Sequence, residues 1–256
     1  MKPGKLDFTY IIFTLLGGVV LLFIIAPLLG VFINTSGGQY LETVMDGEVR
    51  ESILLTLFAS MGATLLFALL AVPLAYVLAR RDFLLKEVID GIIDLPVVIP
   101  HSAAGIALLG MLAPLQDGTG IRFVGGVPGI MAAMAFVSIP FLVNSARDGF
   151  AAVDRKLEKA ALNLGASPAR VFFTVSLPLA WRSVVSGLVL MWGRGLSEFG
   201  AVVIIAYHPM ITPVMIYERF GAFGLEYARP VAAVFLIVCL AFFVVMRVLA
   251  GRRSHA

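Results

Sequence analysis

The sequence predicts an all-α integral membrane protein with about six transmembrane helices. Hydrophobic residues make up 60% of the 256-residue chain and charged residues only 14%, whereas soluble domains carry about 25% charged residues. The apolar runs are long and do not alternate with polar residues. A helix needs roughly 20 residues to cross a hydrocarbon core about 30 Å thick. These runs therefore indicate spanning helices rather than the strands of a barrel.

We expect all the spans to belong to one transmembrane domain, residues 1-256. The six apolar runs lie at residues 9–33, 52–79, 88–114, 124–146, 179–207 and 229–250. The first run is too long for the core of a cleaved signal, so it is interpreted as a span. The single cysteine, Cys239, excludes an intramolecular disulfide. No group of residues in the sequence indicates a catalytic or metal site.

Lysine and arginine residues gather on one side of these spans. That side carries Lys2, Lys5, Arg80, Arg81, Lys86, Arg147, Arg155, Lys156, Lys159, Arg170, Arg182, Arg247, Arg252 and Arg253. Because cationic loops stay in the cytoplasm, we expect both termini and residues 147–178 to be cytoplasmic in a multi-pass protein of the cell membrane. The formal net charge of +3 is small and unevenly placed, which argues for a membrane orientation and against a nucleic-acid partner.

The third apolar run contains prolines where a helix should be regular. The stretch DLPVVIPHSAAGIALL places Pro96 and Pro100 inside the predicted span. Proline removes a backbone donor, so we expect local kinking there. We favour a hydrogen-bonded interior position for His101, because no second histidine or cysteine indicates a metal site. Pro100, His101 and Ser102 are also candidates for the transport pathway or gate.

Residues 147–178 interrupt the apolar sequence with a charged segment. From Asp154 to Leu164 apolar residues recur at helical spacing, with charged residues on the other face, which predicts an amphipathic helix. Asp154 is a candidate N-cap, and Gly165 stands where a helix ends in a left-handed conformation. Ser167-Pro168 predicts a second helix start, and Pro178 is expected to break the chain again. The segment should form a rigid knob.

The sequence of this knob is compatible with three interpretations. Small residues at Ala160 and Ala161 favour close packing against another protein. An interfacial linker lying on lipid headgroups is the alternative, and it stays open. Two short helices across a glycine turn also suggest a DNA-binding motif. The second helix is apolar at Phe172 and Phe173, so it packs inward and the DNA-binding interpretation is discounted.

The fifth apolar run contains two opposite charges. WGRGLSEFGA places Arg194 and Glu198 four residues apart, and ionisable groups inside a membrane turn toward partners or a water-filled path. A mutually neutralising pair that only locks the bundle is one interpretation. Arginine before glutamate is the weaker order for a helical pair, so we favour a pathway or gate role for Arg194, Ser197 and Glu198.

Two segments on the opposite side from the knob are long enough to fold locally. Residues 34–51 contain turn residues, and residues 207–228 are rich in aromatic and apolar residues. The second segment either dips back toward the bundle or forms an aromatic belt at the membrane interface. The sequence leaves both possibilities open.

The knob resembles the EAA loop of ABC-importer permeases. The resemblance rests on Glu158, Ala160, Ala161, Gly165, Ala166, Ser167 and Leu177-Pro178. Aligned on Gly165, the usual glutamate of the motif falls on Lys159, and Glu158 stands one residue early. The resemblance implies the type I ABC importer permease fold, with a coupling helix that docks on a separate ATPase subunit. It implies coupling roles for Glu158, Lys159, Ala160, Ala161, Gly165, Ala166, Ser167 and Pro178.

A second resemblance covers the chain from the second span onward. RGLSEFGAVVIIAYHPM and PVMIYERFGAFGLEYARPVAA are similar to the permeases of tungstate/molybdate ABC importers, especially the archaeal type. The resemblance implies oxyanion import, a homodimer and an extracytoplasmic oxyanion-binding protein. The chain has no G-x-x-x-x-G-K-[ST] loop, which agrees with ATP and Mg binding to a partner ATPase subunit. The chain itself is therefore expected to be a transport subunit, not an enzyme, with no cofactor of its own.

Two alternative functions remain. The chain could serve another oxyanion such as sulfate, or it could be an ion-coupled secondary anion transporter. Secondary transporters often place paired broken helices at a midplane site. Pro100 to Ser102 is one candidate break, but the sequence shows no matching second segment, and the knob would have no purpose there. A membrane scaffold without transport is disfavoured by the charges within the fifth run.

Overall fold

The computed structural model describes residues 8–252, and every regular element in that range is a helix. Part of the orientation argument depends on residues outside this range, namely Lys2, Lys5 and Arg253. The long helices are α1 (Phe8–Ile33), α3 (Gly47–Arg80), α6 (Val127–Ala152), α9 (Leu177–Leu196) and α12 (Leu225–Arg252). Five helices within residues 8–252 are long and apolar enough to cross a membrane, or six if one bent pair is a single broken span.

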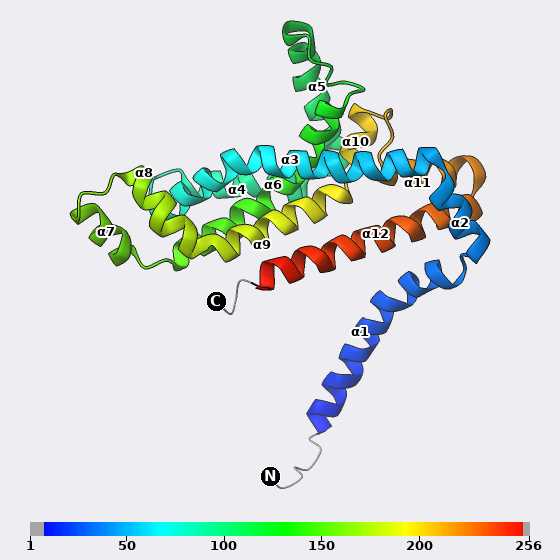
Figure 1. Cartoon of the computed structure of the whole chain (residues 1–256), viewed down its shortest axis with the longest axis horizontal. Helices are drawn as coiled ribbons and strands as arrows, with labels where there is room; N and C mark the ends of the chain where they lie inside the picture. The colour runs from blue at the N-terminus through cyan, green and yellow to red at the C-terminus, as the bar shows by residue number, and fades with distance from the viewer. Residues whose placement is uncertain (1–7, 253–256) are drawn as a thin grey trace.

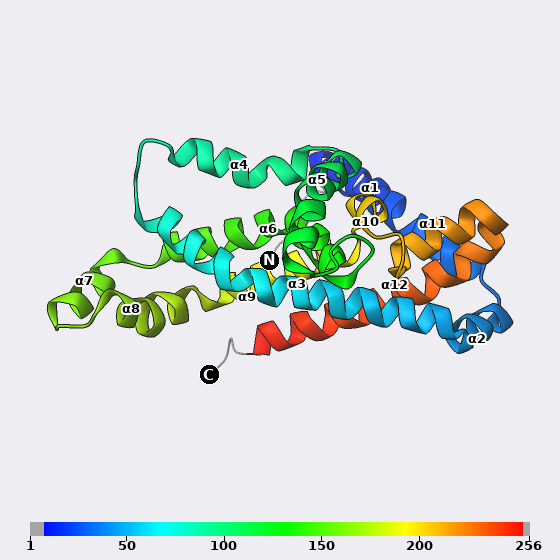
Figure 2. The same ribbon diagram turned by 90° about the horizontal axis from the view of Figure 1, so that it is seen from above.

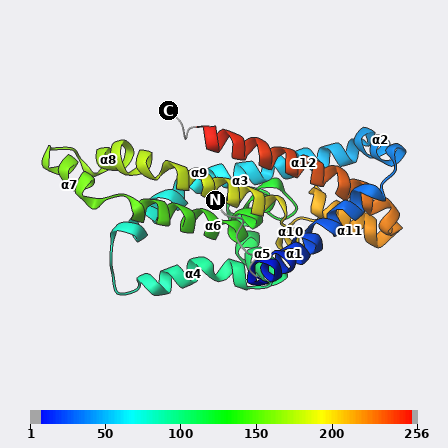
Figure 3. The same ribbon diagram turned by 90° about the horizontal axis from the view of Figure 1, so that it is seen from below.

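Figures 1 and 2 show α3, α6, α9 and α12 running lengthwise beside one another, and their packing against one another agrees with this arrangement. One end of this bundle carries α7 (Arg155–Asn163) and α8 (Pro168–Val171). The opposite end carries α2 (Gly37–Met45) and α11 (Thr212–Phe223). Helices α1 and α5 (His101–Thr119) leave the bundle in opposite directions, as Figure 1 shows, and overlap each other in the view from below in Figure 3.

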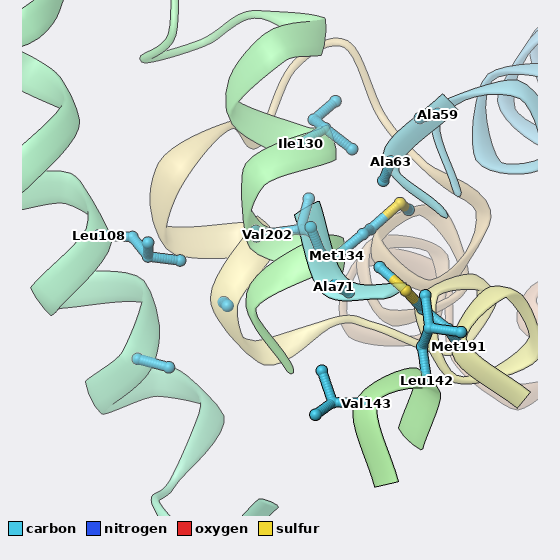
Figure 4. Packing of buried hydrophobic residues seen from close by; sticks show 14 of the residues in the cluster. Ala59, Ala63, Ala71, Leu108, Ile130, Met134, Leu142, Val143, Met191 and Val202 are labelled. Carbon is cyan, nitrogen blue, oxygen red and sulfur yellow. The ribbon is translucent and has the colours of Figure 1, made fainter. Parts of the chain in front are cut away.

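Small side chains let the central helices pack closely. Ala59, Ala63 and Ala71 of α3 are buried together with Met134 and Met191 (Figure 4). A Cβ atom at Gly187 of α9 would lie only 3.0 Å from the Ser145 Cβ atom of α6. In lipid, where apolar contact alone gives little driving force between helices, such close approach supplies van der Waals packing. The core therefore lies between α3, α6 and α9.

Buried hydroxyl groups add hydrogen bonds to this packing. The Ser60 hydroxyl of α3 donates to the Trp192 carbonyl oxygen of α9 at 2.8 Å. The Thr56 hydroxyl accepts from the Thr212 backbone N–H at 2.8 Å, which fixes the start of α11 against α3. Because Thr212, Val214 and Met215 are all buried, the segment 207–228 returns to the bundle. The aromatic residues that follow, Tyr217, Phe220, Phe223 and Tyr227, are exposed, so a place for them at the membrane interface stays a prediction.

The third expected span, 88–114, is not one kinked helix. It consists of α4 (Lys86–Val98) and α5, which meet at 112°. Ile99 takes an extended conformation with ψ 147°, as residues before proline do, and Pro100 cannot donate to the preceding turn. Pro96 lies within α4 without ending it. Of the two prolines, Pro100 therefore produces the break.

The fifth expected span, 179–207, is also interrupted. Helix α9 ends at Leu196, and the short helix α10 (Gly200–Ile205) begins after a gap of irregular backbone. Ser197 and Phe199 have φ/ψ values of −90°/4° and −124°/−53°. Glu198 therefore lies in the break between α9 and α10. It is not on the same helix as Arg194, although it follows Arg194 by four residues. The structure thus has the second broken segment that the sequence analysis did not find.

Candidate transport site and coupling loop

The coupling loop, residues 147–178, contains the helix, glycine turn and helix that the sequence predicts. The Asp154 side chain accepts from the Lys156 N–H at 2.8 Å and caps α7. Gly165 has φ +86°, and the Ala166 N–H donates to the Ala161 carbonyl oxygen at 3.1 Å. A bond of this span is the signature of a helix that ends through a left-handed residue.

Pro178 does not break the loop from the fifth span, which corrects the expectation from the sequence. Helix α8 continues through a π-helical segment, η1 (Phe172–Ser176), directly into α9. At the end of η1 the Leu177 N–H donates to the Phe172 carbonyl oxygen. Pro178 then stands in the first turn of α9, directly after this π-helical segment. The coupling loop is therefore joined to α9 by continuous helical backbone.

Glu158 points into the protein. It is only 8% exposed, and its Oε1 atom accepts hydrogen bonds from Arg80 Nε at 3.0 Å, Arg80 Nη2 at 2.8 Å and Ser176 Oγ at 2.6 Å. Arg80 Nη2 also donates to the Val153 carbonyl oxygen at 3.1 Å. The ends of α3, α6, α7 and η1 thus meet at one carboxylate. The sequence analysis missed Arg80 and Ser176.

Aromatic rings support the base of the loop beside this carboxylate. The Tyr76 ring of α3 makes edge contacts with Phe150 of α6 and Phe172 of η1, at centroid distances of 5.3 and 5.0 Å. Edge-to-face pairs of this kind stabilise by about 0.5–1.5 kcal/mol beyond their buried area. The base of the loop is consequently fixed to the bundle, while α7 extends beyond it (Figure 2).

The outer face of the coupling loop is exposed. Lys159, Ala160, Gly165, Ser167 and Pro178 are exposed, and Ala161 and Ala166 are half-buried. Large apolar side chains accompany them, because Leu157, Leu162 and Leu164 are all exposed. Exposed apolar side chains that gather on one segment indicate a contact surface for a partner. Among the sequence-predicted coupling residues, Glu158 alone is turned away from this face.

A second cluster joins the two broken segments. Arg194 Nη2 lies 2.8 Å from His101 Nε2, and Glu198 Oε2 lies 3.2 Å from both Arg194 Nη2 and His101 Nδ1. Neither of the two contacts to Glu198 Oε2 has the geometry of a hydrogen bond. The other oxygen, Oε1, accepts from the Ala201 N–H at 2.9 Å. Glu198, fully buried, therefore caps α10 while its free oxygen faces two cationic or ionisable groups.

The remaining pathway candidates lie around this cluster. Arg194 Nη1 donates to Ser197 Oγ at 3.2 Å. Pro100 is the N-cap residue of α5 and is exposed. Ser102 is exposed and makes no side-chain hydrogen bond within residues 8–252. The structure thus brings together His101, Arg194, Ser197 and Glu198, and leaves Ser102 outside their contacts.

Two glycines allow the broken segments to touch. A Cβ atom at Gly200 would lie 2.7 Å from the His101 Cβ atom, and one at Gly105 would lie 2.9 Å from the Ala201 carbonyl oxygen. Side chains at either position would force α5 and α10 apart. Within the four residues Glu198 to Ala201, the buried Glu198 caps α10, and Gly200 leaves room for α5 to pack closely against α10.

Polar contacts that the sequence analysis missed hold α4 against α6. Asn144 Nδ2 donates to Asp94 Oδ1 at 2.8 Å, and Arg147 Nη1 donates to Asp90 Oδ1 at 2.8 Å. Asp90 and Asp94 are four residues apart and so share one face of α4. That spacing was the available signal, because two acids on one face of an apolar helix need partners. These contacts hold α4 against α6. Because His101 follows the end of α4 by three residues, they also restrict where His101 can lie.

Known proteins share the sequence and the fold. The family described as the binding-protein-dependent transport system inner membrane component matches residues 71–255. The molybdate/tungstate transport system permease protein WtpB of Pyrococcus furiosus is 43% identical over 252 residues, covering 98% of each chain. Its counterpart in Pyrococcus abyssi is 41% identical over 251 residues, covering 97% of this chain and 98% of that protein.

Among solved structures, a bacterial ABC transporter that imports the acidic polysaccharide alginate matches with a TM-score of 0.71 at 17% identity. The match covers 95% of this chain and 96% of that chain. This likeness shows the type I ABC importer permease fold that the sequence resemblance implied. The relatives are named as permease proteins, in agreement with a transport subunit rather than an enzyme. The chain is a multi-pass membrane protein and belongs to the binding-protein-dependent transport system inner membrane component family, the permease subunits of ABC importers.

Proposed function

We propose that this chain is the permease through which an ATP-driven importer moves tungstate and molybdate across the cell membrane. The observation that carries the proposal is identity of 41–43% over nearly the full length to permeases named for these two ions. Both termini and the coupling loop would face the cytoplasm, as the distribution of basic residues suggests. ATP and Mg would bind to the separate ATPase subunit.

The proposed assembly is a homodimer of this chain with an ATPase dimer and an extracytoplasmic oxyanion-binding protein. Two features support the second copy. Helix α1 contributes no buried residues in its most apolar stretch, and α5 projects from the bundle with Ile106 and Met111 exposed (Figure 1). These surfaces would be covered by the second copy and by lipid.

The ATPase would dock on the exposed face of the coupling loop. Leu157, Leu162 and Leu164 provide apolar anchors on that face, which is the kind of contact that contributes most to binding between proteins. Closure of the ATPase dimer would move α7. That movement would reach α3 through the Arg80–Glu158 pair and α9 through the continuous helical backbone of η1.

The cluster of His101, Arg194 and Glu198 would act in the pathway or gate. Arg194 offers positive charge to a passing dianion, but Glu198 lies 3.2 Å away and offsets that charge. A site with weak net attraction lets an ion enter and leave, whereas a strong site would retain it. Ion specificity would then reside in the binding protein. The permease would supply a path that opens alternately to each side.

An ion-coupled secondary transporter remains the second candidate because paired broken helices are present. It leaves the exposed coupling loop without a role, and family membership favours the ATP-driven importer. Sulfate is the competing ion for the importer itself.

The test is uptake into proteoliposomes that contain this chain, its ATPase and its binding protein. We expect ATP-dependent uptake of tungstate and molybdate that exceeds uptake of sulfate. Omission of the ATPase provides the control. Uptake that persists without the ATPase would contradict ATP-driven import, and sulfate uptake above that of the other ions would contradict the proposed substrates.

A further inference from the structure

A basic hollow lies between the end of α3 and the coupling loop. Its volume is about 470 Å³, and four cationic side chains, Arg80, Arg81, Arg155 and Lys159, line it together with one carboxylate, Glu158. Glu158 is already paired with Arg80. The other three cations have no acidic partner within residues 8–252, so the hollow carries uncompensated positive charge.

The backbone holds one of these cations in place. Arg155 Nη2 donates to the Ala79 carbonyl oxygen at 3.4 Å, which directs the side chain back from α7 toward the end of α3. Arg81 is exposed directly after α3 ends, and Lys159 is exposed on α7. Three cations from two elements therefore converge on one hollow, which is the arrangement that binds phosphate oxygens.

The surroundings of the hollow indicate a ligand that is apolar on one side. Tyr76, Leu162 and Val171 contribute to its lining. On α3 the exposed side chains Leu70, Leu74 and Val77 recur at helical spacing and lead to the hollow. Arg81 follows Val77 by four residues and so continues the same face. An apolar strip on a spanning helix that ends in a basic hollow fits an acyl chain joined to an anionic headgroup.

We propose that this hollow binds the phosphate group of an anionic phospholipid, with an acyl chain lying along the exposed face of α3. Arg81, Arg155 and Lys159 contact the phosphate oxygens. The bound lipid lies beside the Arg80–Glu158 pair and reinforces the link between the coupling loop and α3. The inference depends on the proposed function for its leaflet, which is the cytoplasmic one if the coupling loop is cytoplasmic. Two residues of the hollow, Lys159 and Leu162, also lie on the face proposed for the ATPase, so the lipid and the ATPase would share them.

Native mass spectrometry of the purified permease–ATPase complex tests the proposal. The complex is delipidated and then mixed with equal amounts of phosphatidylglycerol and phosphatidylcholine. We expect phosphatidylglycerol to be retained preferentially. The variant Arg81→Gln/Lys159→Gln should lower that retention by about 25-fold, because each charge near an anionic group contributes about fivefold.

A charge-matched control separates the hollow from general surface attraction. Lys156 and Arg170 are exposed on α7 and α8 and do not line the hollow. The variant Lys156→Gln/Arg170→Gln removes the same charge and should retain phosphatidylglycerol as the unaltered complex does. The variant Arg81→Lys/Lys159→Arg keeps both charges and should also retain it. Equal losses in the hollow variant and the matched control would overturn the proposal.

Two further outcomes would assign the hollow to something else. Equilibrium dialysis of the delipidated complex with inorganic phosphate or tungstate should show no binding that Arg81→Gln/Lys159→Gln removes. Binding of either ion at the hollow, with no preference for phosphatidylglycerol, would make it a site for a free oxyanion. Loss of the ATPase from Arg81→Gln/Lys159→Gln, with lipid retention unchanged, would make it a protein contact. Lipid retention is measured without transport, so its failure is distinct from failure of the proposed function.

Discussion

Arg80, the last residue of α3, directs two guanidinium N–H groups at a single carboxylate oxygen of Glu158 in α7, at 3.0 and 2.8 Å. Both side chains are about nine-tenths buried. A carboxylate in the coupling loop is thus a structural link to a spanning helix. The positive residues Arg155, Lys156 and Lys159 remain on the exposed side of the loop.

Removal of the Glu158 charge should uncouple the loop from α3. Glu158→Gln leaves Arg80 buried without a counter-ion, and breaking a buried pair from one side costs about 3–5 kcal/mol. We expect a lower thermal midpoint of the purified complex and loss of ATP-dependent uptake. The double variant Arg80→Gln/Glu158→Gln should cost less than the sum of the single changes. Additive costs in this cycle would show that the pair does not interact.

Substitution of Gly165 should test the turn of the coupling loop. Its φ of +86° is closed to proline, whose ring holds φ near about −65°. Gly165→Pro should abolish ATP-dependent uptake while the protein still inserts in the membrane. Gly165→Asn should retain much of the uptake, because asparagine tolerates the left-handed conformation better than other residues. Full uptake by the proline variant would mean that the turn does not serve coupling.

Substitutions at Arg194 and Glu198 should show whether this pair acts in the transport pathway or only holds the helices together. Arg194→Ala removes the charge that faces both His101 and Glu198, and Glu198→Ala removes the cap of α10. We expect each to lower tungstate uptake by about tenfold or more, or to leave ATP hydrolysis that no longer drives uptake, since an uncompensated charge remains at the break. Normal uptake and normal coupling in both variants would contradict the pathway role.

A methyl group at Gly200 should separate α5 from α10. The added Cβ atom would stand 2.7 Å from the His101 Cβ atom, and overpacking of this kind costs about 1–3 kcal/mol. We expect Gly200→Ala to lower the thermal midpoint and to reduce uptake. Gly193→Ala is the matched control, because a Cβ atom there meets nothing within 4 Å. Equal effects of the two substitutions would argue against a close contact at Gly200.

The Asp46–Arg219 pair should make the α2–α3 junction sensitive to acid. Burial raises the pKa of Asp46, but the hydrogen bond and charge of Arg219 and the N–H groups of Val49 and Glu48 outweigh burial and hold the pKa below its ordinary 3.8. The stabilisation from this pair is therefore fully present above pH 3.8, the ordinary pKa of the group. It is lost as the pH falls through the lower pKa that Asp46 has in the folded protein. Asp46→Asn should remove this acid-dependent loss, measured as thermal midpoint against pH. An unchanged pH profile in that variant would exclude Asp46 as the group responsible.

Part of the candidate site was predictable because its signals are local. The cap at Asp154, the glycine at 165 and the amphipathic pattern between them are all contained within one short segment, so the helix and turn followed from the sequence. Residues Arg194 and Glu198 were also identifiable, since charges within an apolar run are conspicuous. His101 was predicted to be hydrogen-bonded, and the structure shows its contact with Arg194. The partner itself, 93 residues away, was not predictable from one sequence.

The sequence by itself determined that the chain crosses a membrane several times and that residues 154–173 form a helix, a glycine turn and a second helix start, because span length and helix caps are properties of contiguous residues. Only the tertiary structure decided that Glu158 faces Arg80, 78 residues away. The break at Pro100 was already a candidate from the sequence, but only the tertiary structure showed that the fifth span also breaks, after Leu196, and that the two breaks meet at Gly200. Proline alone does not determine where a helix breaks, since Pro100 follows the end of α4 whereas Pro96 and Pro178 lie within or at the start of regular helices. Whether a helix breaks depends on the partners that satisfy its freed backbone and side-chain groups, and those partners come from distant parts of the chain.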